Sequence, residues 1–221
     1  QIINTYDNIK NAVIKTPLIT SDRLNKKLGF RLWVKCEMLQ RTGSFKFRGA
    51  CNAISTLPND NAPIITYSSG NHAQAVALNA SLAEREATVI MPRDAPLTKR
   101  NATVSLGACV YLYDRDKENR EEIGIKLQNK LKAHLIPPFD DERVIAGQGS
   151  VGVEITQQCE KQGLYPSHLI VCCGGGGLIA GTSLAVSEIF PKCKIFAAEP
   201  KGFDDMKRSL AAKKILFNKP K

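Results

Sequence analysis

Four consecutive glycines constrain this chain more than any other feature. Gly174 to Gly177 follow the apolar run 168–173 and precede a second apolar stretch that begins at Leu178. A turn from a strand into a helix needs one or two glycines, so four indicate a backbone that must approach a ligand closely. Because N–H groups at the start of a helix bind phosphate, the run predicts a phosphate site. No Lys-Ser or Lys-Thr pair follows, which excludes a nucleoside triphosphate P-loop.

The rest of the chain alternates short apolar strands with helical segments. Such alternation is typical of a mostly parallel sheet with helices on both faces, where ligands bind at the carboxyl ends of the strands. Pro137-Pro138 and Gly147-Gln148-Gly149 predict a boundary between two lobes. The expected strands are 63–67, 87–91, 108–113, 135–139, 168–173 and 194–198, and the expected helices are 73–84, 97–106, 116–133, 152–162 and 178–190.

Composition narrows the possible partners. The 221 residues carry a net charge of +10, of which the segment 201–221 supplies half, but no nucleic-acid-binding motif accompanies it. No apolar run approaches the roughly 18 residues that a membrane span needs. The seven cysteines show no C-x-x-C spacing, which argues against zinc and for reduced thiols. We therefore expect a soluble cytoplasmic protein with no nucleic-acid or membrane partner.

A lysine between two phenylalanines is the candidate nucleophile. Residues 42–50 read TGSFKFRGA, and Ser44 is a preferred helix N-cap, which places Lys46 in the first helical turn. There the helix dipole and the flanking Phe45 and Phe47 all disfavour an ammonium ion. Imine chemistry requires a neutral amine. Most lysines in a first turn are merely solvated, so the residues alone leave both interpretations of Lys46 open.

A third polar motif lies between an expected strand and an expected helix. Residues 68–72 read SSGNH, and their hydroxyls, amide and backbone N–H groups are suited to an anion such as a carboxylate. The same residues are also typical of an ordinary turn with a helix cap. Taken together, an imine-forming lysine, an anion site and a phosphate site favour pyridoxal phosphate with an amino-acid substrate.

One alternative cofactor also fits the glycines. Gly175, Gly177 and Ala180 match a relaxed dinucleotide fingerprint, and Glu199 ends the next expected strand, where a ribose ligand would lie. A nicotinamide or flavin oxidoreductase is therefore the second candidate from the residues alone.

The three motifs resemble those of fold-type II pyridoxal-phosphate enzymes, most closely the serine racemase and serine/threonine dehydratase branch. They are SFKFRGA at 44–50, SSGNHA at 68–73 and GGGGL at 174–178, in the order found in that family. The likeness runs from Thr16 to Leu210. It implies an α/β fold with two open, mostly parallel sheets, in a large and a small lobe, covered by helices.

The resemblance also implies a division into lobes and a reaction. The large cofactor-binding lobe would comprise 1–54 and 147–221, and the small substrate-side lobe 55–146. The reaction would begin with removal of the Cα proton from a serine- or threonine-type 3-hydroxy amino acid. Elimination of the β-hydroxyl would give a 2-oxo acid and ammonia, whereas reprotonation on the opposite face would racemise serine. A non-catalytic, truncated homologue is a further alternative.

Individual roles follow from the resemblance. Lys46 would hold the cofactor and act as the base on one face of the substrate Cα, and Ser69 would serve the opposite face. The other implied contacts are Phe45, Asn71, Gly174, Gly175, Gly176, Gly177 and Leu178 with pyridoxal phosphate; Ser68, Ser69, Asn71 and His72 with the substrate carboxylate; and Glu199, the Phe203 carbonyl and Asp205 with Mg²⁺ or Ca²⁺.

Some positions point in different directions within this branch. The pair Ser68-Ser69 favours the racemases, whereas the run IPPFDD at 136–141 resembles the bacterial catabolic threonine dehydratases. The balance between racemisation and elimination therefore stays open. The resemblance also implies a homodimer, and a C-terminal third that this chain lacks.

Overall fold

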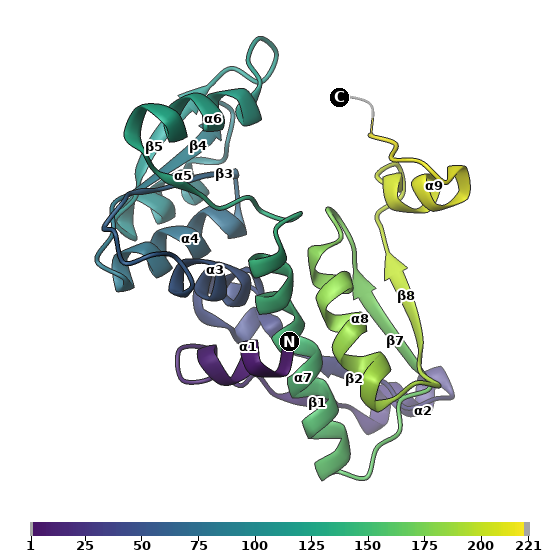
Figure 1. Ribbon diagram of the computed structural model, residues 1–221. Coiled ribbons are helices and arrows are strands. Elements are labelled where there is room, and N and C mark those ends of the chain that lie inside the picture. Colours follow the sequence, from purple (N-terminus) through teal and green to yellow (C-terminus); the bar gives the residue numbers. More distant parts are fainter. Residues whose placement is uncertain (1, 219–221) are drawn as a thin grey trace.

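The computed structural model describes residues 2–218, which form two lobes and a C-terminal segment (Figure 1). The small lobe contains one four-stranded sheet whose pairs are all parallel, in the order β5-β4-β3-β6. Helices α4 and α5 pack on one face of the sheet and α6 on the other. The elements are β3 (Ile64–Tyr67), α4 (Asn71–Leu82), β4 (Ala87–Pro92), α5 (Leu97–Ser105), β5 (Cys109–Tyr113), α6 (Arg120–Leu131) and β6 (His134–Leu135).

The strand order creates a natural ligand site. The chain runs from β3 outward to β5 and then returns to place β6 on the other side of β3. At such a switch point the two loops that leave neighbouring strands diverge and open a crevice at the carboxyl edge of the sheet. The loop after β3 is the SSGNH motif, and the segment after β6 begins at Ile136.

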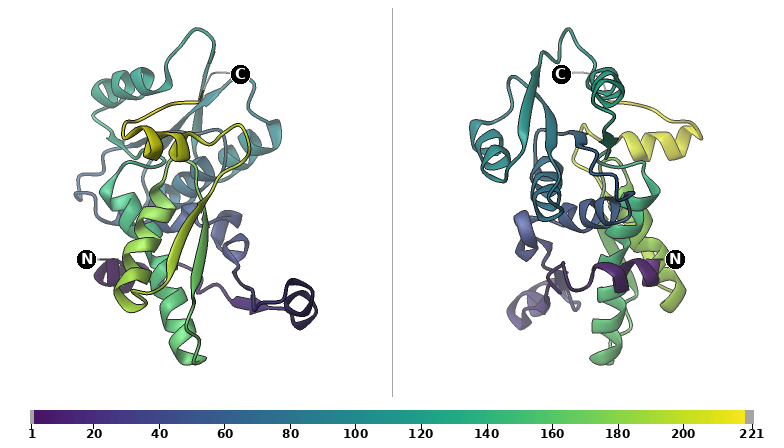
Figure 2. Two further views of the ribbon diagram at one scale, coloured as in Figure 1. Left: turned by 90° about the vertical axis from the view of Figure 1, so that its right-hand side faces the viewer. Right: turned by 60° about the vertical axis from the view of Figure 1, so that its left-hand side comes forward.

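The large lobe is built on helices α7 and α8. Its strands form two separate pairs, β1–β2 antiparallel and β7–β8 parallel, rather than one continuous sheet. The parallel pair lies at the margin of the lobe (Figure 2) and remains largely exposed. The elements are α1 (Ile2–Ile9), β1 (Leu18–Thr20), α2 (Asp22–Leu28), β2 (Trp33–Lys35), the 3-10 turns Glu37–Leu39 and Arg41–Gly43, α3 (Lys46–Ser55), α7 (Glu142–Lys161), β7 (His168–Cys172), α8 (Gly177–Ile189), β8 (Lys194–Ala198) and α9 (Asp205–Ala212).

Helix α7 corrects the expected lobe boundary. It runs unbroken from Glu142 to Lys161, so Gly147-Gln148-Gly149 lies inside a helix and not in a linker. The glycines permit close packing: a Cβ on Gly147 would lie 2.6 Å from the carbonyl oxygen of Arg48, and one on Gly152 would lie 2.8 Å from that of Thr182. The contacts with α3 and α8 therefore override the low helix propensity of glycine.

Other expected elements are confirmed with shifted ends. The helix expected at 116–133 begins at Arg120, because Asn119 caps it by accepting from the N–H groups of Glu121 and Glu122. The strand expected at 135–139 contains only His134 and Leu135. Within residues 2–218 no helix is long and apolar enough to cross a membrane.

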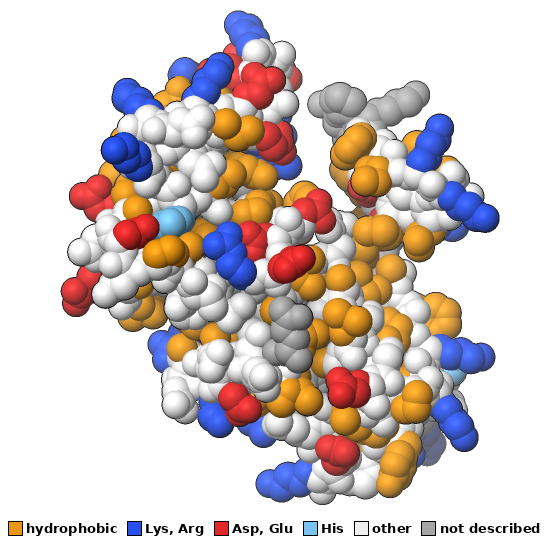
Figure 3. Space-filling view, in the orientation of Figure 1, with side chains coloured by type: hydrophobic (Ala, Val, Ile, Leu, Met, Phe, Trp, Pro, Cys, Tyr) orange, Lys and Arg blue, Asp and Glu red, His pale blue; other side chains and the backbone are white. Residues whose placement is uncertain are grey.

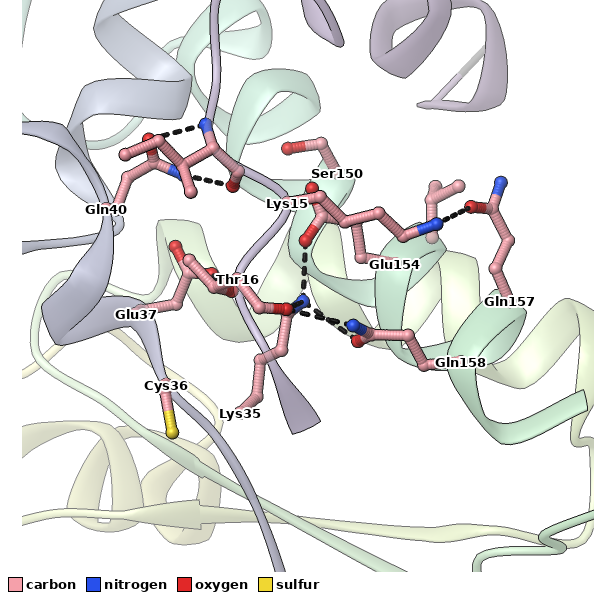
Figure 4. A network of polar contacts seen from close by, with 12 residues as sticks. Lys15, Thr16, Lys35, Cys36, Glu37, Gln40, Ser150, Glu154, Gln157 and Gln158 are labelled. Atoms are coloured by element: carbon pink, nitrogen blue, oxygen red, sulfur yellow. Dashed lines mark hydrogen bonds and ion pairs between the residues drawn. The ribbon is translucent and has the colours of Figure 1, made fainter. Parts of the chain in front are cut away.

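A buried network of charges joins α3, α7 and the segment after β2. The Arg48 side chain is fully buried and donates two hydrogen bonds each to the carboxylates of Glu37 and Glu154, at 2.7–3.0 Å. Lys35 donates to Glu154 at 2.5 Å and to the Thr16 carbonyl oxygen at 2.7 Å (Figure 4). Two cations thus balance two carboxylates, which is the condition under which buried charge is tolerated.

We predict that Glu154→Gln destabilises the chain by about 3–5 kcal/mol, because the substitution leaves Arg48 and Lys35 with one carboxylate between them in the interior. Urea unfolding at neutral pH followed by circular dichroism measures the change. Glu160→Gln, at an exposed position on the same helix, is the matched control and should shift stability by no more than about 0.5 kcal/mol. Equal unfolding midpoints for the two variants would contradict the prediction.

Candidate active site

A cavity of about 450 Å³ brings the lysine motif and the glycine run together. Residues from four parts of the fold line it: the start of α3, the segment after β6, the turn between β7 and α8, and the end of β8. The turn before α8 faces the recess that separates the small lobe from the C-terminal segment (Figure 3). The lining includes Phe45, Lys46, Phe139, Cys172, Gly174, Gly175, Gly176, Gly177, Leu178 and Glu199.

Lys46 is the first residue of α3, and its amine points into this cavity. Burial lowers the pKa of Lys46 from 10.5 to about 8, so the neutral amine is accessible near neutral pH. The amine donates to the Pro138 carbonyl oxygen at 2.6 Å and lies 5.5 Å from the centre of the Phe45 ring. These contacts fix the nucleophile at the mouth of the glycine turn.

The expected Ser44 cap is wrong by one residue. The N-cap position is Phe45, which makes no side-chain capping bond, and the Ser44 hydroxyl is buried without a hydrogen-bond partner. The preceding 3-10 turn, with Thr42 at φ 59° and Gly43 at φ 70°, rotates Ser44 out of the capping geometry.

The glycine turn has the form expected of a phosphate site. Gly176 caps α8 in the left-handed region at φ 84° and has no side chain to satisfy the N–H groups of the first turn. A Cβ on Gly175 would collide with the Phe139 ring. The sequence between β7 and α8 therefore needs glycine both for its backbone conformation and for its contact with Phe139.

The SSGNH loop lies at the crevice of the small lobe. Ser68 and Ser69 follow β3 and line a second cavity, of about 130 Å³, at the carboxyl edge of the sheet. Asn71 begins α4, whose Gly70 cap makes no side-chain hydrogen bond, so the first N–H groups of the helix are open to an anion. The Asn71 amide oxygen accepts from Lys99 at 3.0 Å.

The His72 ring points away from this anion site. It is buried, with Nε2 3.2 Å from the Ile136 carbonyl oxygen and with Nδ1 unpartnered. Burial, with a further contribution from the Lys46 charge, lowers the pKa of His72 to about 3, so the ring is neutral. His72 can therefore offer a substrate carboxylate its backbone N–H but not a charged side chain.

The three residues expected to hold a cation have other partners here. Both carboxylate oxygens of Glu199 accept N–H groups at the start of α9, from Met206 and Lys207 at 2.9 Å. Asp205 Oδ1 accepts from the Asn218 amide at 2.8 Å. The part of the chain between residues 2 and 218 contains no cluster of three or more His, Cys, Asp or Glu side chains suited to a metal. The arrangement of these residues does not fit a cation.

Sequence reasoning missed several residues of the site. Pro138 and Phe139 follow β6 and reach the large-lobe cavity, while Arg115 and Arg120 line the small-lobe cavity. The run IPPFDD directly after a short strand was the available signal for the first pair. The two arginines lie in a charged stretch that otherwise resembles a solvated surface.

The main cavity fits a ligand with an aldehyde and a phosphate. One end offers the desolvated amine of Lys46, and the other offers the uncapped N–H groups of the glycine turn. Between them the Phe45 and Phe139 side chains supply apolar surface for an aromatic ring. A dinucleotide is less well served, because the carboxylate of Glu199 is engaged by α9 rather than open to a ribose.

Comparisons with known proteins agree with this cavity. The family model described as "Pyridoxal-phosphate dependent enzyme" matches residues 9–220. The chain is 43% identical to the L-threo-3-hydroxyaspartate ammonia-lyase of Saccharomyces cerevisiae, over 100% of this chain and 67% of that enzyme. The solved structure of maize serine racemase superposes with a TM-score of 0.92 at 38% identity, covering 98% of this chain and 65% of that one.

A third similarity extends the range of activities. A threonine deaminase from the organism abbreviated T.th. superposes with a TM-score of 0.91 at 42% identity, covering 97% of this chain and 69% of that one. The chain thus spans about two thirds of the length of these relatives. The matched residues include both cavities and the whole α/β architecture, and they confirm the expected fold class. This chain therefore belongs to the pyridoxal-phosphate dependent enzyme family and has its fold-type II architecture.

Proposed function

We propose that the chain carries the active site of an enzyme that removes the Cα proton of 3-hydroxy amino acids with the help of pyridoxal phosphate. The products would be a 2-oxo acid and ammonia, the inverted amino acid, or both. The single observation that carries this proposal is the desolvated Lys46 amine in one cavity with the four-glycine turn. Its relatives include an ammonia-lyase, a serine racemase and a threonine deaminase.

The cofactor would be held by residues of the main cavity. The N–H groups of the glycine turn would bind its phosphate, Lys46 would bond to its aldehyde carbon, and Phe45 would pack on its ring. When bound, pyridoxal phosphate supplies an electron sink that makes the substrate Cα proton acidic. Asn71 donates from its amide nitrogen, because Lys99 already occupies the amide oxygen.

Proton transfers would fall to two side chains on opposite lobes. Lys46 Nζ takes the Cα proton on one face, and its lowered pKa matches a base that works near neutral pH. Ser69 Oγ, at the end of β3, faces the crevice from the small lobe and returns a proton on the other face. The N–H groups at the start of α4 hold the substrate carboxylate.

The remaining expectations about the setting stay proposals. A cytoplasmic location is supported by seven free cysteines, five of them buried. We retain the expected homodimer on the resemblance alone. The cation at Glu199, the Phe203 carbonyl and Asp205 would require Glu199 to release the N–H groups of α9.

One observation favours a second candidate function, a non-catalytic partner of a complete homologue. The β7–β8 pair exposes Ile170 (70%) and Phe196 (49%), which is apolar surface suited to another polypeptide. In that case the chain would associate with a complete homologue but would not bond to the cofactor.

We predict one covalent adduct after the chain is mixed with pyridoxal phosphate and reduced with borohydride, because Lys46 is the desolvated lysine of the cofactor cavity. Intact mass and peptide mapping locate it. Lys46→Arg should abolish the adduct, whereas Lys15→Arg, at an exposed position in the same lobe, should retain it. An adduct that survives in Lys46→Arg, or none in either chain, would overturn the assignment.

We predict that Ser69→Ala lowers the ratio of D-serine to pyruvate formed from L-serine by about 100-fold or more, the lower end of what a positioned acid contributes. Chiral chromatography and a pyruvate assay give the two rates. Ser68→Ala serves as the neighbouring control, since its hydroxyl accepts from the Gly70 N–H within the loop. An unchanged product ratio in Ser69→Ala would remove Ser69 from the proton transfer.

A further inference from the structure

The small-lobe cavity contains more positive charge than a serine or threonine side chain needs. It lies at the carboxyl ends of β3, β4 and β5, beside the loop that faces the substrate. Its volume is about 130 Å³, which is room for a small polar group but not for the cofactor. Its polar lining comes from the hydroxyls of Ser68, Ser69 and Tyr113 and the guanidinium groups of Arg115 and Arg120.

Both guanidinium groups are held in place by contacts outside the cavity. Arg120 is the first residue of α6, and its guanidinium lies 5.2 Å from the centre of the Tyr67 ring, a cation–π contact. Arg115 follows β5, and its Nη2 lies 2.9 Å from Asp94 Oδ1. The two elements thus deliver two cations to one side of the Ser68-Ser69 pair.

The nearby acidic groups do not saturate these cations. Asp94 and Glu121 are 64% and 48% exposed, and ion pairs at such positions contribute little. The bond from Arg120 to Glu121 uses only Nε, and those from Arg115 to Asp94 use Nε and Nη2. The Glu118 carboxylate is engaged elsewhere, because it accepts from the backbone N–H of Asp114. Each guanidinium retains N–H donors for a ligand.

A third cation lies on the other side of the same loop. Lys99 of α5 donates to Asn71 at the start of α4, where the proposed substrate carboxylate would bind. The loop between residues 68 and 71 is therefore flanked by positive charge at both ends. One anionic group accounts for Lys99 and the first turn of α4, and the arginine pair is left for a second.

We propose that the small-lobe cavity binds a carboxylate on the side chain of the substrate, so that the preferred substrates are 3-hydroxy amino acids with an acidic side chain. Arginine pairs bind carboxylates through parallel N–H donors with a fixed geometry, which gives both affinity and selection. A hydroxymethyl or hydroxyethyl side chain would leave both guanidinium groups without this partner. The proposal rests on the function proposed above and specifies its substrate class.

The test uses two four-carbon ligands that differ in one charged group. Succinate has a carboxylate at each end, whereas butyrate has only one, and neither requires the cofactor or turnover. Binding of each to the unmodified chain is measured by isothermal titration calorimetry at low ionic strength. We expect the Kd for succinate to be at least about 10-fold lower than that for butyrate, which corresponds to about 1.4 kcal/mol.

Variants identify the residues responsible. The double variant Arg115→Gln/Arg120→Gln should lose the preference for succinate, and Arg120→Lys should retain only part of it, since an ammonium cannot bind a carboxylate with two parallel donors. Arg23→Gln, on α2 of the other lobe, removes a positive charge and is the control, which should keep the full preference. Circular dichroism shows whether each variant is folded.

The outcomes separate this inference from the proposed function. Equal affinities for succinate and butyrate in the unmodified chain, or no binding of either, would overturn the anion site even if the double variant failed to fold. A preference that persists in the folded double variant would also overturn it. If the borohydride adduct forms on Lys46 while succinate shows no preference, the proposed function stands and only the substrate class fails.

Discussion

The paired hydrogen bonds from Arg48 to two carboxylates are the contacts on which the site depends. Arg48 follows Lys46 by two residues, so holding its side chain between Glu37 and Glu154 fixes the first turn of α3 against α7. Gly147 allows the two helices to approach at this point, where a side chain would collide with the Arg48 carbonyl oxygen. The nucleophilic amine therefore sits on a helix that can neither rotate nor shift without separating buried charges.

The second constraint is the path of the chain between β6 and α7. This short segment carries the Ile136 carbonyl oxygen, which contacts His72, and the Pro138 carbonyl oxygen, which accepts from Lys46. It also carries Phe139, whose ring lies against Gly175. A single segment thus contacts the SSGNH loop, the nucleophile and the glycine turn. The main cavity is shaped by this connection and not by any one motif.

Much of this could be predicted from sequence, because the motifs that bind a ligand need unusual residues. Four glycines after an apolar strand are more than a turn requires, and Lys46 between two phenylalanines indicates a desolvated amine. The start of α7 could not be predicted this way, since its glycines look like a break until the close approach of α3 and α8 is known. Arg115 and Arg120 are 51% and 40% exposed, and only the order of the strands shows that they share a cavity with Ser69.

The central claim is that the fold keeps the Lys46 amine desolvated and ready to react. Burial favours the neutral form, so its pKa falls and about half of the amine is neutral at a pH near 8. A pH titration of the side-chain NMR signals of a labelled chain, with Lys46 assigned from Lys46→Arg, measures this directly. The account predicts a midpoint near 8 for Lys46. A midpoint near 10.4, as for an exposed lysine, would contradict it.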